Sequence, residues 1–183
     1  MRRKGFTLVE LIIVITILAI LCAIGLVSFR DLSRKYRVEN QIRRTYSDLM
    51  NARTRAMHTN MTHFVNFGLN QYAIYQDTNL NKTLDIPPAG DTQVLMRQGP
   101  DVEPYSVLNN NPGNENIIWS GGAVPVQIDG RGLVSAGSTG TICIAAQNVQ
   151  VVHNCITVTR TRIAIGQWTG QAAGVCDANH CAQ

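Results

Sequence analysis

The sequence predicts an α+β protein in which one long N-terminal α-helix packs on an all-antiparallel β domain. An apolar run stands near the start, a helical pattern follows it, and short alternating apolar segments fill the chain from residue 62. The 183 residues suit one domain and an appendage. The predicted parts are a basic start (1–5), an apolar helix (6–29), its amphipathic continuation (30–60) and an antiparallel β domain with a disulfide-closed tail (61–183).

The apolar helix is long enough to cross a membrane. Its 24 residues, Phe6 to Phe29, would extend about 36 Å, and no charge falls between Leu11 and Val27. Three cations within residues 1–4 would keep the start of the chain on the cytoplasmic side. The segment therefore predicts a single-pass membrane anchor with the β domain on the opposite side.

Other N-terminal signals fit these residues less well. A cleavable secretory signal would have a shorter apolar region and a small-x-small exit, which is lacking before Arg30. A lipoprotein signal ending at Cys22 would need a small residue before the cysteine, where Leu21 stands. A plain signal anchor is an alternative, but it explains neither Glu10 nor the abrupt change at Gly5. A carboxylate inside such a segment is costly, so Glu10 predicts a function.

Apolar residues at helical spacing continue the helix. The repeating positions are Val38, Ile42, Tyr46, Leu49 and Met57, with Ala52 and Ala56 beside them. Neither Pro nor Gly occurs between Gly25 and Gly68, so we predict one helix from about residue 6 to residue 58, roughly 80 Å long. We interpret its cationic face as a solvated surface with side chains that snorkel near the membrane, with contact to anionic partners as the alternative.

Charge divides the chain into a basic N-terminal third and a mildly acidic remainder. Residues 30–55 hold eight cations against three anions, whereas residues 56–183 hold five cations against eight anions. The formal net charge of +4 would fall to +1 if residues 1–5 were removed. The composition therefore argues against a protein whose whole surface binds polyanions.

Short strands separated by Gly, Asn and Asp clusters predict the β domain. "HFVNFG" and "QYAIYQD" form a predicted hairpin, and "TQVLMR", "AVPVQID", "GLVSAG", "GTICIAA" and "VQVVHNCITVTRTRIAIG" follow. Residues 108–122 predict a long polar loop. Strands in this order indicate antiparallel pairing and not βαβ units.

Four cysteines outside the apolar run favour two disulfides and an oxidising compartment. They are Cys143, Cys155, Cys176 and Cys181. Four cysteines permit three pairings, of which we favour Cys176–Cys181 as a small loop and Cys143–Cys155 as a cross-strand link. His180 beside Cys181 resembles half of a zinc site, but the tail holds one such cluster only, so we expect a disulfide-closed loop and no metal.

One loop places oxygen side chains at the spacing of a calcium loop. Asp77, Asn79, Asn81 and Asp85 occupy positions 1, 3, 5 and 9 of such a loop. The glycine of position 6 is replaced by Lys82 and the carboxylate of position 12 by Pro88. Asp91 would substitute only if the loop folded back. We expect an Asx-rich turn between strands, with calcium as the alternative.

The sequence contains no motif that predicts catalysis. It holds no nucleophile elbow, phosphate-binding glycine loop, HExxH motif or pair of acids suited to acid–base chemistry. We expect a protein that is not an enzyme and needs no cofactor.

The stretch "KGFTLVELIIVITILAIL", residues 4–21, resembles the leader of type IV pilins and of the pseudopilins of type II secretion. The resemblance implies that prepilin peptidase cuts between Gly5 and Phe6, that Phe6 is then N-methylated, and that Glu10 is the acidic assembly residue. Glu10 follows the new amine by four residues on one helical face, and the resemblance implies a pair between neighbouring subunits. Many members have a proline near the end of the apolar run, where this chain has Val27.

The order of the remaining elements resembles minor pilins and pseudopilins of the GspH/FimT type. A hairpin follows the helix, and a "DxNxN" turn, a "DGRG" turn and a strand with Arg160 and Arg162 come after it. Some relatives carry Gly-Arg-x-Arg at the last position and bind DNA, whereas this chain has Thr159 in place of the glycine. Two residues apart in a strand, the arginines would share a face. We favour a plain outer strand face, because a DNA footprint normally needs a wider basic patch.

The predicted function is that of a minor pilin or pseudopilin. The resemblance implies a subunit of the bacterial inner membrane with its β domain in the periplasm, which enters a type IV pilus or a type II secretion pseudopilus. It would initiate or cap assembly, with other pilins or pseudopilins as partners. The alternative is a fibre-borne DNA-binding pilin for DNA uptake that uses Arg160 and Arg162.

Overall fold

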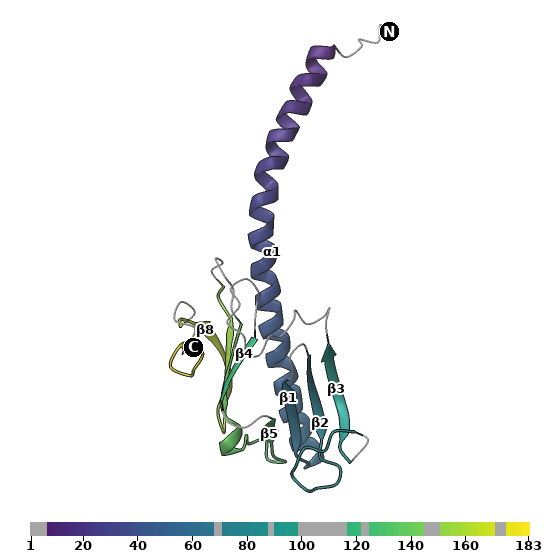
Figure 1. Cartoon of the computed structure of the whole chain (residues 1–183), viewed down its shortest axis with the longest axis vertical. Coiled ribbons are helices and arrows are strands. Elements are labelled where there is room, and N and C mark those ends of the chain that lie inside the picture. Colours follow the sequence, from purple (N-terminus) through teal and green to yellow (C-terminus); the bar gives the residue numbers. More distant parts are fainter. Residues whose placement is uncertain are drawn as a thin grey trace.

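The structure is a computed structural model that describes residues 7–67, 71–87, 90–98, 117–121, 125–144, 151–170 and 175–183. It contains one long helix, α1 (Leu8–Thr59), and two antiparallel sheets. The sheets flank the C-terminal half of α1, and the N-terminal half extends beyond the domain (Figure 1). The predicted α+β class and antiparallel β domain are confirmed.

Helix α1 begins and ends at residues that cap it. Thr7 is the N-cap, with extended backbone angles, and its hydroxyl accepts a hydrogen bond from the Glu10 backbone N–H. Asn60 ends the helix in the left-handed conformation at φ 52°. The 52 residues extend about 78 Å. The predicted helix from about residue 6 to residue 58 is therefore confirmed to within two residues.

The two halves of α1 have different surroundings. From Leu8 to Leu21 the large apolar side chains are exposed, with exposed fractions between 46% at Ile12 and 73% at Leu8. In the C-terminal half, by contrast, a stripe of five side chains is buried: Val38, Ile42, Leu49, Ala52 and Ala56. Met57, which we expected on the same stripe, is 46% exposed. Met57 follows the buried Ala56 by one position, which turns it about 100° around the helix and away from the stripe.

Within the part of the chain that the structure describes, no helix has both the length and the apolar character needed to span a membrane.

The first sheet has the strand order β3-β2-β1-β5. Its strands are β1 (His63–Phe67), β2 (Gln71–Gln76), β3 (Thr92–Gln98) and β5 (Val126–Ile128). β1 pairs with β2 along its length, from His63 opposite Gln76 to Phe67 opposite Tyr72. The predicted hairpin directly after the helix is therefore confirmed.

The second sheet has the order β4-β6-β7-β8-β9. Its strands are β4 (Ile117–Gly121), β6 (Gly140–Ile144), β7 (Cys155–Val158), β8 (Ile163–Trp168) and β9 (Cys181–Ala182). α1 contacts β1 and β5 of the first sheet and β7 and β8 of the second, so one core joins the helix to both sheets.

The predicted strand 132–137 and the predicted loop 108–122 differ from the structure. The segment 132–137 forms a single bridge from Val134 to Ile128 and then a short 3₁₀ helix, η1 (Ala136–Ser138). A tight turn held by Asp129 leaves little chain for pairing there. The predicted loop 108–122 contains β4 at its end. The apolar residues Ile117, Ile118 and Trp119 fit a strand, and the polar composition before them hid this signal.

An ion pair fastens the first sheet to α1. The Asp48 carboxylate on α1 receives Nε of Arg97 at 3.0 Å and Nη2 at 3.2 Å, and the Tyr72 hydroxyl donates to the same carboxylate. Asp48 is buried. The hydrogen bond to Asp48 raises the pKa of Arg97 above its ordinary value. We call Asp48, Tyr72 and Arg97 the helix–sheet latch.

Candidate functional site

The predicted assembly residue, Glu10, lies in the first turn of α1. Gly5 and Phe6 lie outside the described residues. Glu10 is described, and it forms a capping box with Thr7. The Thr7 backbone N–H and hydroxyl lie 3.5 and 3.4 Å from the same oxygen of Glu10. The carboxylate therefore helps to define the first turn of the helix.

The capping box describes Glu10 alone, because Phe6 lies outside the described residues. The one-turn helical spacing between the Phe6 amine and Glu10 in the processed chain stays a prediction. Glu10 lies in the exposed, apolar N-terminal half of α1, which does not pack on any other described part of the subunit. A carboxylate so placed would meet a neighbour's groups when such helices pack together.

A comparison with protein-family models finds one match. Residues 1–26 match the prokaryotic N-terminal methylation motif. The chain carries a type IV pilin-like prepilin leader. The motif implies processing by prepilin peptidase and assembly with other pilins, and it indicates a membrane-anchored, pilus-related protein. No curated protein and no solved structure was found to match the chain.

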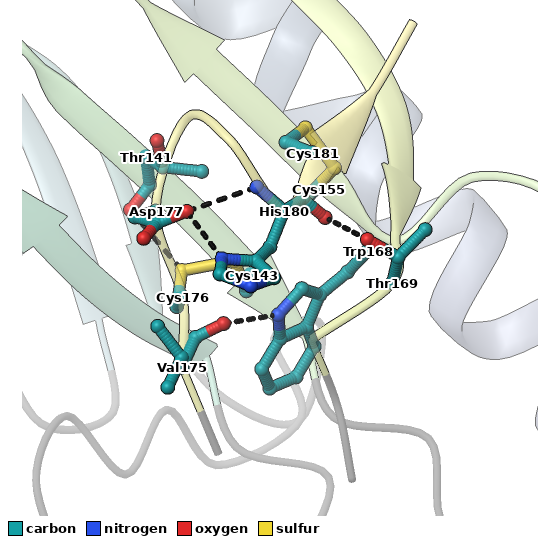
Figure 2. A network of polar contacts seen from close by, with 10 residues as sticks. All are labelled: Thr141, Cys143, Cys155, Trp168, Thr169, Val175, Cys176, Asp177, His180 and Cys181. Atoms are coloured by element: carbon teal, nitrogen blue, oxygen red, sulfur yellow. Dashed lines mark hydrogen bonds and ion pairs between the residues drawn. A yellow bond between two sulfur atoms is a disulfide. The ribbon is translucent and has the colours of Figure 1, made fainter. Parts of the chain in front are cut away.

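The C-terminal tail of this pilin-like chain is held by two disulfides, as expected, but both favoured pairings were wrong. The bonds are Cys143–Cys176 and Cys155–Cys181. Cys143 and Cys155 are opposite each other in the β6–β7 register and therefore lie on one face of the sheet. The tail crosses this face, and each strand cysteine binds one tail cysteine (Figure 2).

Polar contacts complete the attachment of the tail. Trp168 Nε1 donates to the Val175 carbonyl at 2.7 Å, and the Thr169 backbone N–H donates to the His180 carbonyl at 2.8 Å. The His180 ring lies 2.6 Å from the Asp177 carboxylate (Figure 2). Hydrogen bonds from His180 lower the pKa of Asp177. The contact between His180 and Asp177 thus stabilises the turn of the C-terminal tail.

The calcium candidates are brought together in one loop, and their oxygens already have donors. Asp77 accepts the backbone N–H groups of Asn81 and Lys82 at 3.2 and 3.0 Å. Asp85 accepts the side-chain amides of Asn79 and Asn81 at 2.9 and 2.5 Å. These contacts form the Asx-rich turn that we expected.

The loop also folds back, as a substitute calcium ligand would require. The Asp85 backbone N–H donates to the Asp91 carboxylate at 2.8 Å, and Asp91 is buried. Even so, within the described residues no three His, Cys, Asp or Glu side chains form a group that would hold a metal ion. Calcium binding at this loop stays a prediction.

The two arginines of the DNA hypothesis lie in a turn and not on a strand face. β7 ends at Val158 and β8 begins at Ile163, so residues 159–162 connect them. The Thr159 hydroxyl and backbone N–H both donate to the Arg162 carbonyl at 2.8 Å. Both hydrogen bonds close the turn between β7 and β8. Arg160 and Arg162 are both exposed at its tip.

Two adjoining hollows lie at the end of the domain where α1 ends, since Asn60 and Met61, which follow the helix, line the first of them. Their volumes are about 330 and 290 Å³, and both are lined by Thr62, Lys82, Asp129 and Arg131. Arg160 lines the second hollow, whereas Arg162 lines neither. We call the two hollows the distal groove. Sequence reasoning missed it because its cations are 29 or more positions apart and seemed scattered.

One buried histidine lies close to this end of the domain. His63 on β1 is fully buried, and its Nδ1 lies 3.2 Å from the Met61 carbonyl. Its Nε2 is buried without a hydrogen-bond partner among the described residues. Burial lowers the pKa of His63 below its ordinary value of 6.5, although the Met61 contact opposes the shift. His63 therefore belongs to the core as a neutral side chain.

Proposed function

We propose that this chain is a minor pilin or pseudopilin that initiates or caps a fibre. It is made as a prepilin, anchored once in the bacterial inner membrane with its β domain in the periplasm, and cut between Gly5 and Phe6. It then enters a type IV pilus or a type II secretion pseudopilus at low copy. N-methylated Phe6 and Glu10 form the assembly contact with neighbouring subunits.

One observation carries this proposal: the chain has the methylation motif at the start of a helix whose N-terminal half is exposed. Residues 1–26 match the motif, and α1 carries Glu10 at one end and a packed domain at the other. Exposed apolar side chains from Leu8 to Leu21 are costly in water, so they need lipid or other helices around them. The hairpin after the helix, the "DxNxN" turn and the "DGRG" turn support the minor GspH/FimT type.

The first experiment determines the mature N-terminus. The full chain is expressed with and without an active prepilin peptidase, and intact-mass spectrometry measures the product. We expect loss of residues 1–5 and the added mass of one methyl group only where the peptidase is active. A chain that keeps Met1 beside an active peptidase would contradict the proposal.

The second experiment tests the assembly role of Glu10. Glu10→Ala removes both the charge and the capping contact to Thr7, whereas Glu10→Gln removes the charge and keeps an acceptor for the cap. We expect both variants to be inserted and processed but depleted from sheared fibres. If only Glu10→Ala is depleted, helix capping and not charge pairing is the function of Glu10.

We assign no catalytic activity to the chain. The sequence offers no nucleophile, acid–base pair or phosphate loop in a known arrangement. Incubation of the purified full chain with general esterase and phosphatase substrates tests this assignment, and turnover that co-purifies with the protein would oppose it.

DNA capture is the second candidate function, and one observation favours it. Arg160 and Arg162 are exposed at the β7–β8 tip, and neither has an ion-pair partner within the described residues. Gel retardation with the full chain in detergent tests this function. Weak and equal retardation by the native chain and by the Arg160→Ala/Arg162→Ala variant would remove it.

A further inference from the structure

We propose that the distal groove binds a phosphate or sulfate group of an anionic ligand through Lys82, Arg131 and Arg160. Residues 56–183 hold only five cations against eight anions, yet three of these five line one groove. The three come from separate segments: the loop after β2, the turn after β5 and the β7–β8 hairpin. Three positive charges close together repel one another, which costs free energy. A bound anion would offset this cost.

The charge balance of the second hollow is positive. Asp129 is the one carboxylate among the described residues that line it, and Arg131 Nη2 lies 3.0 Å from this carboxylate. Lys82 and Arg160 have no ion-pair partner within the described part of the chain. Two of the three cations are therefore left for a ligand, and Arg131 keeps donors that Asp129 does not use.

Hydrogen bonds fix the backbone at all three cations. The Lys82 N–H donates to Asp77 at 3.0 Å, the Arg131 N–H donates to Asp129 at 2.9 Å, and the Arg160 carbonyl accepts from Val134 at 2.9 Å. A ligand would therefore meet cations on positions that are already ordered, which lowers the entropy cost of binding.

The Asp129 turn is itself held by strong contacts. Burial alone would raise the pKa of Asp129, but hydrogen bonds from Leu133 and Arg131 outweigh it and lower the pKa. Asp129 thus stays ionised and orients Arg131. Gly132 has a φ of 75°, and a side chain there would press on Met57 of α1. The turn is thus seated directly on the end of the helix.

The arrangement suits a tetrahedral oxyanion better than a carboxylate. Cations on three segments can each meet a different oxygen of phosphate or sulfate, whereas a carboxylate offers two oxygens. The volumes of about 290 and 330 Å³ are at the small end of ligand pockets. Such a group can come from a small phosphorylated molecule or from a phosphodiester polymer.

The test is a titration of the full chain in neutral detergent at low salt, with two probes in separate arms. One probe is pyrophosphate and the other is a short single-stranded oligonucleotide without a terminal phosphate. The chain offers a matched control, because Arg160→Ala and Arg162→Ala remove the same charge from one hairpin, and only Arg160 lines the groove. Lys82→Asn is the third variant, since Asn tolerates the φ of 60° at this position.

We expect saturable binding of at least one probe by the native chain. Arg160→Ala and Lys82→Asn should each weaken it about tenfold, which is about 1.4 kcal/mol, and Arg162→Ala should change it less than about twofold. Pyrophosphate binding assigns the groove to small ligands, and oligonucleotide binding alone with the same discrimination assigns it to a polymer. Equal losses from Arg160→Ala and Arg162→Ala, or no binding of either probe, would overturn the proposal. Unchanged circular dichroism of the variants excludes misfolding as the cause.

Discussion

The helix–sheet latch gives the sharpest prediction for stability. Asp48→Ala removes the carboxylate that receives the Tyr72 hydroxyl and two nitrogens of Arg97. Side-chain exposure is 9% for Asp48 and 28% for Arg97. Removing one member of a buried ion pair costs about 3–5 kcal/mol. Because Arg97 can recover part of its hydration, we expect a loss of about 2–3 kcal/mol in the free energy of unfolding.

Two further substitutions separate charge from geometry in the latch. Asp48→Asn keeps one acceptor and removes the charge, so we expect a loss of about 1–2 kcal/mol. Arg97→Ala together with Asp48→Ala should cost less than the sum of the single changes, with a coupling energy of about 1–2 kcal/mol. Ser47→Ala is the control, because Ser47 is exposed at the neighbouring position of α1.

The measurement is urea unfolding of the full chain in detergent under oxidising conditions, followed by tryptophan fluorescence. The control should stay within about 0.5 kcal/mol of the native chain. A loss below that limit for Asp48→Ala, or additive effects of Asp48→Ala and Arg97→Ala, would refute the idea that the latch fastens the sheet to the helix.

Three further predictions concern the β domain. The pKa of His63 is lowered below 6.5 in the folded state, so the contribution of His63 to stability should be fully present above pH 6.5 and should fall as the pH drops just below that value. The free energy of unfolding of a His63→Asn variant should lack this pH dependence. The same pH profile in the variant and the native chain would contradict this prediction. A Cβ at Gly166 would lie 2.3 Å from the Ala182 carbonyl oxygen, so Gly166→Ala should displace β9 and raise hydrogen exchange in the tail, where unchanged protection would count against the contact. Replacing Cys143 and Cys176 by serine opens a link over 33 positions and should cost about 3–4 kcal/mol in urea unfolding, whereas a loss below 1 kcal/mol would show that the tail adds little.

The helix and most strands could be predicted because their signals are local. The spacing of Val38, Ile42 and Leu49 gives the buried stripe of α1, and alternation gives β1 and β2. The disulfide pairing could not be predicted in this way. It depends on the path of the tail across β6 and β7, which no residue pattern near Cys176 or Cys181 encodes.

The distal groove and the latch were missed for a related reason. Arg97 and Arg131 look alike in the sequence, since each is a single cation with no other Lys or Arg within ten positions. Strand register places Arg97 opposite Tyr72 and within reach of Asp48, whereas the Asp129 turn leaves Arg131 exposed at the groove. Pairings between distant segments thus decide whether a cation forms an ion pair inside the fold or remains available to a ligand.

The continuous helix connects the two ends of the proposed function. Glu10 and Asp48 are 38 positions apart on α1, and 38 residues of helix extend about 57 Å. Because α1 runs without a break from Leu8 to Thr59, a register imposed at Glu10 by neighbouring helices would also fix the height and rotation of the domain that the latch holds. Val27 fits this continuous helix, since it keeps its backbone N–H available for the helical ladder at a position where many type IV pilins have a proline. A contact made among apolar side chains at one end can therefore set how the distal groove is presented at the other.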